Sequence, residues 1–156
     1  MTQVLRPGVL AGVRVRVAGS GPLGAAVLAR MRALGAQDGG PDVLVVDAAG
    51  MFAAAAGVDA VRSALDGGWA AIQPEAAGSK LILLLAPPPG DAHAEAARAG
   101  LENLARTLSI EWARLGIRPV AIHPGTATPA GEVAELAAFL ASPAGAYCSG
   151  CRFDLR

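Results

Sequence analysis

Few residues of this 156-residue chain have types and spacings that suit chemistry. Gly19, Gly21 and Gly24 form a Gly-x-Gly-x-x-Gly pattern between a β-branched segment and a segment with helical apolar spacing. In that context, glycines let the backbone approach a pyrophosphate at a helix N-terminus. The alternative is a tight turn that only packs a helix against a strand. Pro22 favours this alternative, because proline has no N–H to donate.

The histidines and cysteines are the other candidates. His93 could act as a general acid or base, since its ordinary pKa is about 6.5, but we favour a solvent-facing position near a helix start. His123 precedes a Pro-Gly turn and is assigned no catalytic role. Cys148 and Cys151 have the spacing of a redox motif, which needs a helix N-terminus to stabilise a thiolate. They enter a predicted strand instead, so we expect two isolated thiols and no metal site.

Strand and helix patterns alternate along the chain. Strands are predicted at 13–18, 42–46, 81–85, 119–122 and 147–155, and helices at 25–34, 58–65, 92–115 and 131–141. Segment 37–41 is predicted as a loop, segment 51–56 fits helix or loop, and the helix at 58–65 either breaks at Gly67 or continues to 77. This order predicts an α/β fold: one Rossmann-like domain over 1–156, a three-layer sandwich with a shortened parallel sheet of about five strands flanked by helices.

Charge and composition narrow the function classes. The chain has 13 Lys and Arg against 13 Asp and Glu, so it lacks the basic surface that binding to nucleic acid or an anionic membrane needs. The longest strongly apolar run, 81–86, is far shorter than the about 20 residues of a membrane span. Segment 1–12 has no apolar core of a signal peptide. A cytoplasmic protein is therefore expected.

Two features suggest how the fold is stabilised. Arg14 and Arg16 alternate with valines in the first strand, which is typical of a charged sheet edge protected from pairing; a small anion patch is the alternative. Aromatic residues make up only 4% of the chain, and alanine and glycine are abundant. Such a core buries little area per residue, so we expect its stability to depend on a partner.

Several segments, from about Leu5 to the C-terminus with one gap, resemble the short-chain dehydrogenase/reductase family of Rossmann-type, NAD(P)-dependent oxidoreductases. The strongest match runs over 99–112 and 116–125, and segments 138–143 and 150–155 are similar to the family's last helix and strand. Asp47-Ala48-Ala49-Gly50 stands where the family usually has Asn-Asn-Ala-Gly. The resemblance implies seven cofactor-binding positions, which are Gly19, Gly21, Gly24, Asp47, Gly50, Pro124 and Gly125.

The sequence departs from this family at its catalytic positions. Family enzymes use a Tyr and a Lys four residues apart on the long helix, and these positions correspond to Ala94 and Arg98. The single Tyr of the chain is Tyr147 and the single Lys is Lys80, and neither could supply that pair. A methyl side chain cannot exchange a proton. The place of the family's Ser holds Ala86 and three prolines. No catalytic residue is therefore assigned.

A second departure is a deletion. In the family, two strands and the residue that reads the adenosine ribose lie between the first helix and the strand before Asn-Asn-Ala-Gly. Here Gly35 and Asp42 are nearly adjacent. We expect the domain to lack both strands, and the acidic ribose ligand with them. No cofactor is expected, and NAD(P) is the one that the resemblance would imply.

The long helix is kept close to the family pattern although the catalytic positions are not. Trp112 and the leucine stripe of this helix are expected to be mostly core, but in the family the helix also packs against another subunit. The resemblance therefore implies an interface formed by Leu101, Leu104, Leu108, Trp112, Phe139, Tyr147 and Phe153. The leading hypothesis is a non-catalytic protein of this type, a pseudoenzyme acting as a structural or regulatory subunit in a homo-oligomer or with a full-length active relative.

Two other functions stay open. One is an NAD(P)-dependent oxidoreductase with an atypical proton donor, such as His93, or with active-site residues that a partner supplies. The other is a binder of acyl-CoA-like or steroid-like molecules in the crevice at the carboxyl ends of the strands.

Overall fold

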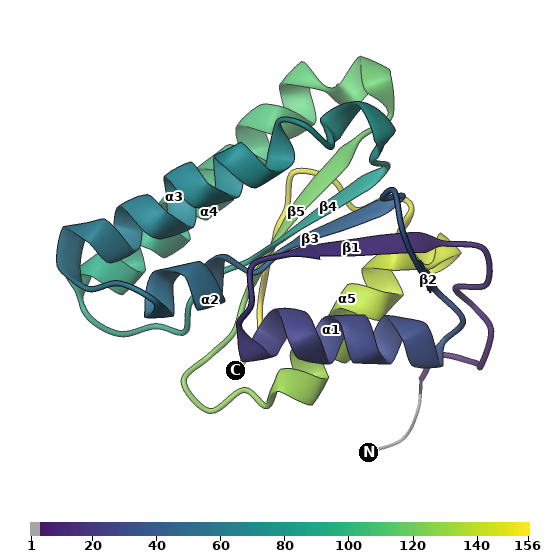
Figure 1. Cartoon of the computed structure of the whole chain (residues 1–156), viewed down its shortest axis with the longest axis horizontal. Helices are drawn as coiled ribbons and strands as arrows, with labels where there is room; N and C mark the ends of the chain where they lie inside the picture. The colour runs from purple at the N-terminus through teal and green to yellow at the C-terminus, as the bar shows by residue number, and fades with distance from the viewer. Residues whose placement is uncertain (1–3) are drawn as a thin grey trace.

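A single parallel sheet of six strands forms the middle layer of the protein (Figure 1). The computed structural model describes residues 4–156. The strands lie side by side in the order β2-β1-β3-β4-β5-β6, and each neighbouring pair is parallel. The strands span Arg14–Ala18 (β1), Gln37–Asp38 (β2), Val43–Val46 (β3), Leu81–Leu85 (β4), Arg118–His123 (β5) and Arg152–Asp154 (β6). The predicted α/β fold with a parallel sheet is confirmed.

Helices cover both faces of this sheet. The α-helices span Pro22–Ala33 (α1), Ala48–Ala53 (α2), Gly57–Ile72 (α3), Ala92–Glu111 (α4) and Ala130–Ala141 (α5). Short 3-10 turns follow at Ala76–Gly78 (η1), Ala113–Leu115 (η2) and Pro143–Gly145 (η3). Helices α1 and α5 lie on one face, and α3 and α4 lie on the other (Figure 1). None of the helices between residues 4 and 156 is long and apolar enough to cross a membrane.

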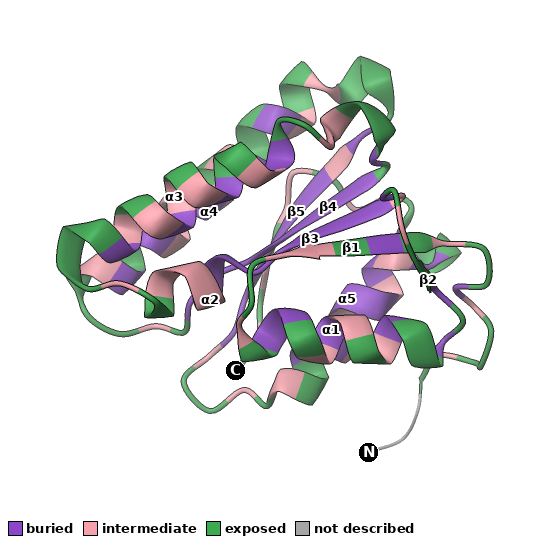
Figure 2. Ribbon diagram, viewed as in Figure 1, coloured by how far each residue is buried: buried purple, intermediate pink, exposed green. Residues whose placement is uncertain are grey.

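The central strands are buried on both faces because their sequences are apolar at every position (Figure 2). Val43 and Val45 pack with α1 and α5, whereas Leu44 and Val46 pack with α3 and α4. The two helix layers therefore bury two separate apolar clusters, one on each side of the sheet. This packing fixes the carboxyl ends of β1, β3, β4 and β5, where the candidate functional residues lie.

The sheet has one more strand than the sequence predicted. The extra strand is β2, a two-residue strand in the segment predicted as a loop, and it pairs Gln37 with Arg14 and Asp38 with Val15. The prediction of a loop over 37–41 is therefore wrong for Gln37 and Asp38. Propensity gave no signal, because neither Gln nor Asp favours strands. The pairing with β1 forms this strand.

The arginines of β1 have partners within the chain. Asp42 accepts hydrogen bonds from the backbone N–H of Arg14 at 2.9 Å and from its Nε at 3.2 Å. The same guanidinium lowers the pKa of Asp42, first by its hydrogen bond and then by its charge. Arg16 pairs with Glu75. These ion pairs leave little free positive charge for an anion patch on this strand.

Two helices and the terminal strand differ from their predicted bounds. Helix α3 continues through Gly67 and Gly68 to Ile72. The predicted long helix divides into α4 and η2, and Gly116 ends it in the left-handed region at φ 70°. The predicted strand 147–155 is also wrong in length, since only β6 forms. The residues before β6 are a loop, and the N–H of Gly150 donates to the carbonyl of Pro119.

Candidate functional site

The glycine loop lies between the carboxyl ends of β1 and β3, at the start of α1. The structure brings five of the seven predicted cofactor residues together here, which are Gly19, Gly21, Gly24, Asp47 and Gly50. A Cβ atom on Gly21 would lie 2.6 Å from the carboxylate of Asp47 and 2.6 Å from the Cα of Gly50. Glycine is therefore required at this position for close packing within the chain.

Asp47 is the centre of this arrangement. Its side chain is fully buried. Its Oδ2 accepts the N–H of Gly24, in the first turn of α1, at 2.8 Å, and its Oδ1 accepts the N–H of Gly50, in the first turn of α2, at 2.9 Å. One carboxylate thus stabilises the N-termini of two helices, where a negative charge is favoured by the helix dipoles. The sequence indicated the position of Asp47 but not this double contact.

This geometry fits the pyrophosphate of a dinucleotide poorly. A pyrophosphate needs free N–H groups at the start of α1. Pro22 has none, the N–H of Gly24 donates to Asp47, and the N–H of Ala25 donates to the carbonyl of Gly21. Within the described chain, Leu23 keeps the one uncommitted N–H of this turn. The carboxylate buried beneath the loop also repels an anion above it.

A crevice opens beside the loop, between the ends of β1 and β3 and helices α2 and α3. It has a volume of about 380 Å³ and is lined by Gly19, Ser20, Gly50, Met51, Ala54, Ser63 and Gly67. The chain leaves β1 toward one side of the sheet and β3 toward the other. In open α/β sheets, ligands bind at such a switch point. Of the residues that the structure describes, no Lys, Arg or His lines this crevice.

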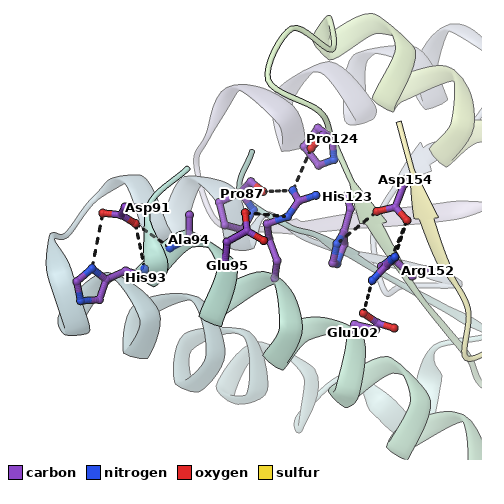
Figure 3. A network of polar contacts seen from close by, with 11 residues as sticks. Pro87, Asp91, His93, Ala94, Glu95, Glu102, His123, Pro124, Arg152 and Asp154 are labelled. Carbon is purple, nitrogen blue, oxygen red and sulfur yellow. Dashed lines mark hydrogen bonds and ion pairs between the residues drawn. The ribbon is translucent and has the colours of Figure 1, made fainter. Parts of the chain in front are cut away.

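The two positions that correspond to the family's Tyr and Lys are occupied by residues that pack within the chain or bond to its backbone. Ala94 is only 4% exposed, so the space around it is already filled. Arg98 donates from Nη1 to the carbonyl oxygens of Pro87 at 2.7 Å and Pro124 at 2.9 Å (Figure 3). It therefore ties the ends of β4 and β5 together.

The remaining predicted cofactor residues, Pro124 and Gly125, lie apart from the glycine loop, in the segment after β5. The carbonyl of Pro124 accepts the hydrogen bond from Arg98. The N–H of Gly125 donates to Oγ1 of Thr128 at 2.8 Å, and a Cβ here would lie 2.8 Å from the carbonyl of Leu155. Both residues therefore close a local turn against the C-terminus.

A polar pocket that the sequence did not indicate lies between α4 and the ends of β5 and β6 (Figure 3). It has a volume of about 230 Å³ and is lined by Glu95, Arg98, Ala99, Glu102, His123, Arg152 and Asp154. His123 is 2% exposed, its Nδ1 lies 3.9 Å from Oδ1 of Asp154, and its Nε2 has no hydrogen-bond partner within the described chain.

The electrostatics of this pocket keep His123 neutral. Burial, followed by the positive charge of Arg98, lowers the pKa of His123 to about 4. Arg152 donates to both Glu102 and Asp154, so the charged side chains around the imidazole largely neutralise one another. Among residues 4–156, no Ser, Thr, Cys or Lys lines the pocket, so a hydroxyl, thiol or amine nucleophile is absent from its lining. The sequence identified His123 but gave no signal of its burial, because the residues that cover it come from α4 and β6, which are distant in the chain.

His93 and the cysteines have surroundings that do not favour chemistry. The His93 side chain is 41% exposed, and its Nδ1 lies 3.6 Å from Oδ2 of Asp91, the residue that caps α4. Cys148 and Cys151 are free thiols in the loop before β6. Burial raises the pKa of the Cys151 thiol, whereas a redox motif requires a lowered one.

The seven residues predicted for an interface occupy different environments. Leu101 and Leu108 are fully buried against the sheet. They cannot offer contact surface to a partner, and the prediction is corrected for these two. Four others, Leu104, Trp112, Phe139 and Phe153, are partly buried. Tyr147 is 98% exposed. The ring of Trp112, the C-cap residue of α4, stacks on that of Trp69 in α3, with centroids 6.2 Å apart.

The Arg98 contacts make a measurable contribution to stability. We expect Arg98→Met to lower the free energy of unfolding by about 1.5 kcal/mol, because two carbonyl groups lose a charged donor. Urea unfolding followed by circular dichroism checks this value. The control is Arg62→Met. Arg62 is exposed, and its ion pair with Asp59 is long, at 3.8 Å, so this substitution should lower the free energy of unfolding by less than about 0.5 kcal/mol. Equal effects of the two substitutions would contradict the prediction.

No protein-family model matches the chain. Among solved structures, BdcA from E. coli superposes with a TM-score of 0.75 at 22% identity over 95% of this chain and 100% of that one, and BdcA has also been solved in complex with NADPH. The citronellol catabolism dehydrogenase AtuB of Pseudomonas aeruginosa gives a TM-score of 0.74 at 22% identity, with 98% and 97% coverage. A short chain dehydrogenase from Mycobacterium smegmatis gives 0.72 at 16% identity, with 100% and 96% coverage. The chain therefore has the fold of the short-chain dehydrogenases/reductases.

Proposed function

We propose that this protein is a non-catalytic relative of the short-chain dehydrogenases/reductases that acts as a structural or regulatory subunit. The observation that carries the proposal is the state of the two positions where the family places its proton-transferring pair. Ala94 is buried and has no titratable group, and Arg98 is held by two backbone carbonyls. Proton transfer to a substrate needs a titratable group within hydrogen-bond reach.

The glycine loop supports the same proposal. A dinucleotide that donates or accepts hydride would have to place its pyrophosphate above the buried Asp47 carboxylate, against a helix start that has lost most of its donors. BdcA is solved with NADPH, so its fold accommodates that cofactor. In this chain the residues of the glycine loop disfavour binding of that cofactor.

The assembly role rests on the exposed apolar side chains of α4, η2 and the segment after η3. Ile110 is 79% exposed, Leu115 is 60% exposed and Tyr147 is 98% exposed. Both regions lie within the segments 92–115 and 136–155, which we propose form the subunit contacts. The partner is a second copy or a full-length active relative. A specific interface buries about 1,600 Å² in total, which would compensate for the small side chains of the core.

The assembly is tested by size-exclusion chromatography with light scattering, on the chain alone and co-expressed with a full-length relative. We expect a mass of at least twice the 15.5 kDa of one chain, or a mixed complex. The double substitution Ile110→Asp and Tyr147→Asp should shift the mass toward the monomer. The control is Val4→Asp, since Val4 is also exposed, at 82%, but lies outside both segments. A monomer that joins no relative would contradict the proposal.

The expected lack of oxidoreductase activity is tested separately on the isolated chain. With ketone or alcohol substrates, we expect no change in absorbance from NADH or NADPH above that of a buffer control. Turnover would overturn the non-catalytic proposal and favour an oxidoreductase with an atypical donor. His93→Asn would then identify whether that donor is His93, and full activity of this variant would point to another group.

A further inference from the structure

The crevice at the switch point of the sheet is the feature that the proposed function leaves unused. Its floor is the glycine loop, and its walls are the middle and the C-terminal end of α2 and the middle of α3. Its volume of about 380 Å³ lies in the range of small-molecule sites, which is about 300–1,000 Å³. We propose that this crevice binds a small, flat, uncharged molecule that carries a hydroxyl or similar polar group, instead of a dinucleotide.

Charge argues for an uncharged ligand. Asp47 places a carboxylate directly under the loop, and it takes up the N–H groups of Gly24 and Gly50. Within residues 4–156, the crevice lining has no Lys, Arg or His to neutralise a phosphate. The nearest arginine along α3, Arg62, is exposed and lies 3.8 Å from Asp59. An anion in the crevice would therefore be repelled by Asp47 without a compensating cation.

The shape and polarity of the lining argue for a flat molecule with a polar end. Glycine and alanine make up most of the wall, and Met51 adds a flexible apolar side chain. The side chains of Ser20 and Ser63 make no hydrogen bonds within residues 4–156, so both hydroxyls are free to bind a ligand. Small residues let a flat ring approach the backbone closely, and the two hydroxyls would orient its polar group.

The test compares two probes that differ in charge. Naphthol and naphthyl phosphate share one flat ring system, and their binding to the isolated chain is followed by probe fluorescence. We expect saturable binding of naphthol with a dissociation constant at least tenfold lower than that of naphthyl phosphate. Inorganic pyrophosphate, ADP and NADPH should give no saturable signal in calorimetry. This measurement does not depend on the assembly, so it can fail while the proposed subunit role holds.

A pair of variants locates the binding. Ala54 lines the crevice and is exposed, whereas Ala53, its neighbour in α2, is exposed but does not line it. Ala54→Phe should fill the crevice and weaken naphthol binding at least tenfold, and Ala53→Phe should leave it unchanged. Asp47→Asn, once shown to be folded by circular dichroism, should bring the dissociation constants of naphthol and naphthyl phosphate closer together.

Any one of four results would overturn the inference. The first is naphthyl phosphate binding as tightly as naphthol, and the second is saturable binding of ADP or NADPH. The third is no saturable naphthol binding up to millimolar concentration, and the fourth is naphthol binding that Ala54→Phe does not weaken.

Discussion

Asp47→Ala is expected to lower the free energy of unfolding by about 3 kcal/mol. The substitution leaves the buried N–H groups of Gly24 and Gly50 without acceptors, and each unsatisfied buried donor costs about 1–3 kcal/mol. It also removes the negative charge from the starts of two helices. Urea unfolding at pH 7, followed by circular dichroism and by tryptophan fluorescence, measures the loss.

The isosteric substitution Asp47→Asn separates hydrogen bonding from packing. An asparagine has one acceptor oxygen, so its amide NH₂ must face one of the two N–H groups that the carboxylate accepts in the wild type. We expect a loss of about 2 kcal/mol. The matched control is Asp91→Asn, because Asp91 caps α4 with Oδ1 alone, which accepts the N–H groups of His93 and Ala94.

Asparagine and aspartate are similarly good N-caps. The Asp91→Asn control should therefore change stability by less than about 0.5 kcal/mol. If Asp47→Asn were equally neutral, the carboxylate could not be accepting from both helices at once, and the electrostatic argument against an anion in the loop would lose its basis.

The fold could be predicted where local sequence determines structure. Strands β3 and β4 are apolar throughout, and Leu101 and Leu108 follow helical spacing, so both layers of the sandwich were visible in the sequence. Strand β2 was not, because two residues of low strand propensity become a strand only through pairing with β1. The terminal strand was predicted too long because Cys148 and Cys151 pack against the core from a loop, whereas Tyr147 is exposed.

The site was predicted only in part, because its key contacts join distant segments. The glycine pattern located the loop, but the contact between Asp47 and Gly24 spans 23 residues. Leu101 and Leu108 were predicted to face a partner, and helical spacing alone cannot distinguish a stripe that faces the sheet from one that faces another subunit. The burial of His123 depends on β6 and α4, which no pattern around residue 123 indicates.

His123 should make the protein less stable as the pH falls from 7 to 5. Its folded-state pKa of about 4 lies below its ordinary value of 6.5, so between these values the unfolded chain binds more protons than the folded one. Stability therefore decreases as the pH falls through 6.5 and levels off below about 4. From this difference, the free energy of unfolding should be about 2 kcal/mol lower at pH 5 than at pH 7.

Between pH 7 and pH 5, the contribution of His123 to the pH dependence of stability can be separated from those of the carboxylates. Asp38, Asp42 and Asp91 have pKa values lowered from 3.8, so their contributions are lost only at more acidic pH. In urea unfolding, His123→Asn should remove most of the pH dependence of the free energy of unfolding. His93→Asn should keep this pH dependence, because His93 is exposed. In the wild type, the imidazole NMR signals of His123 should show no inflection above pH 5. An inflection near pH 6.5 would mean that water reaches the ring and that the pocket at the ends of β5 and β6 does not bury it.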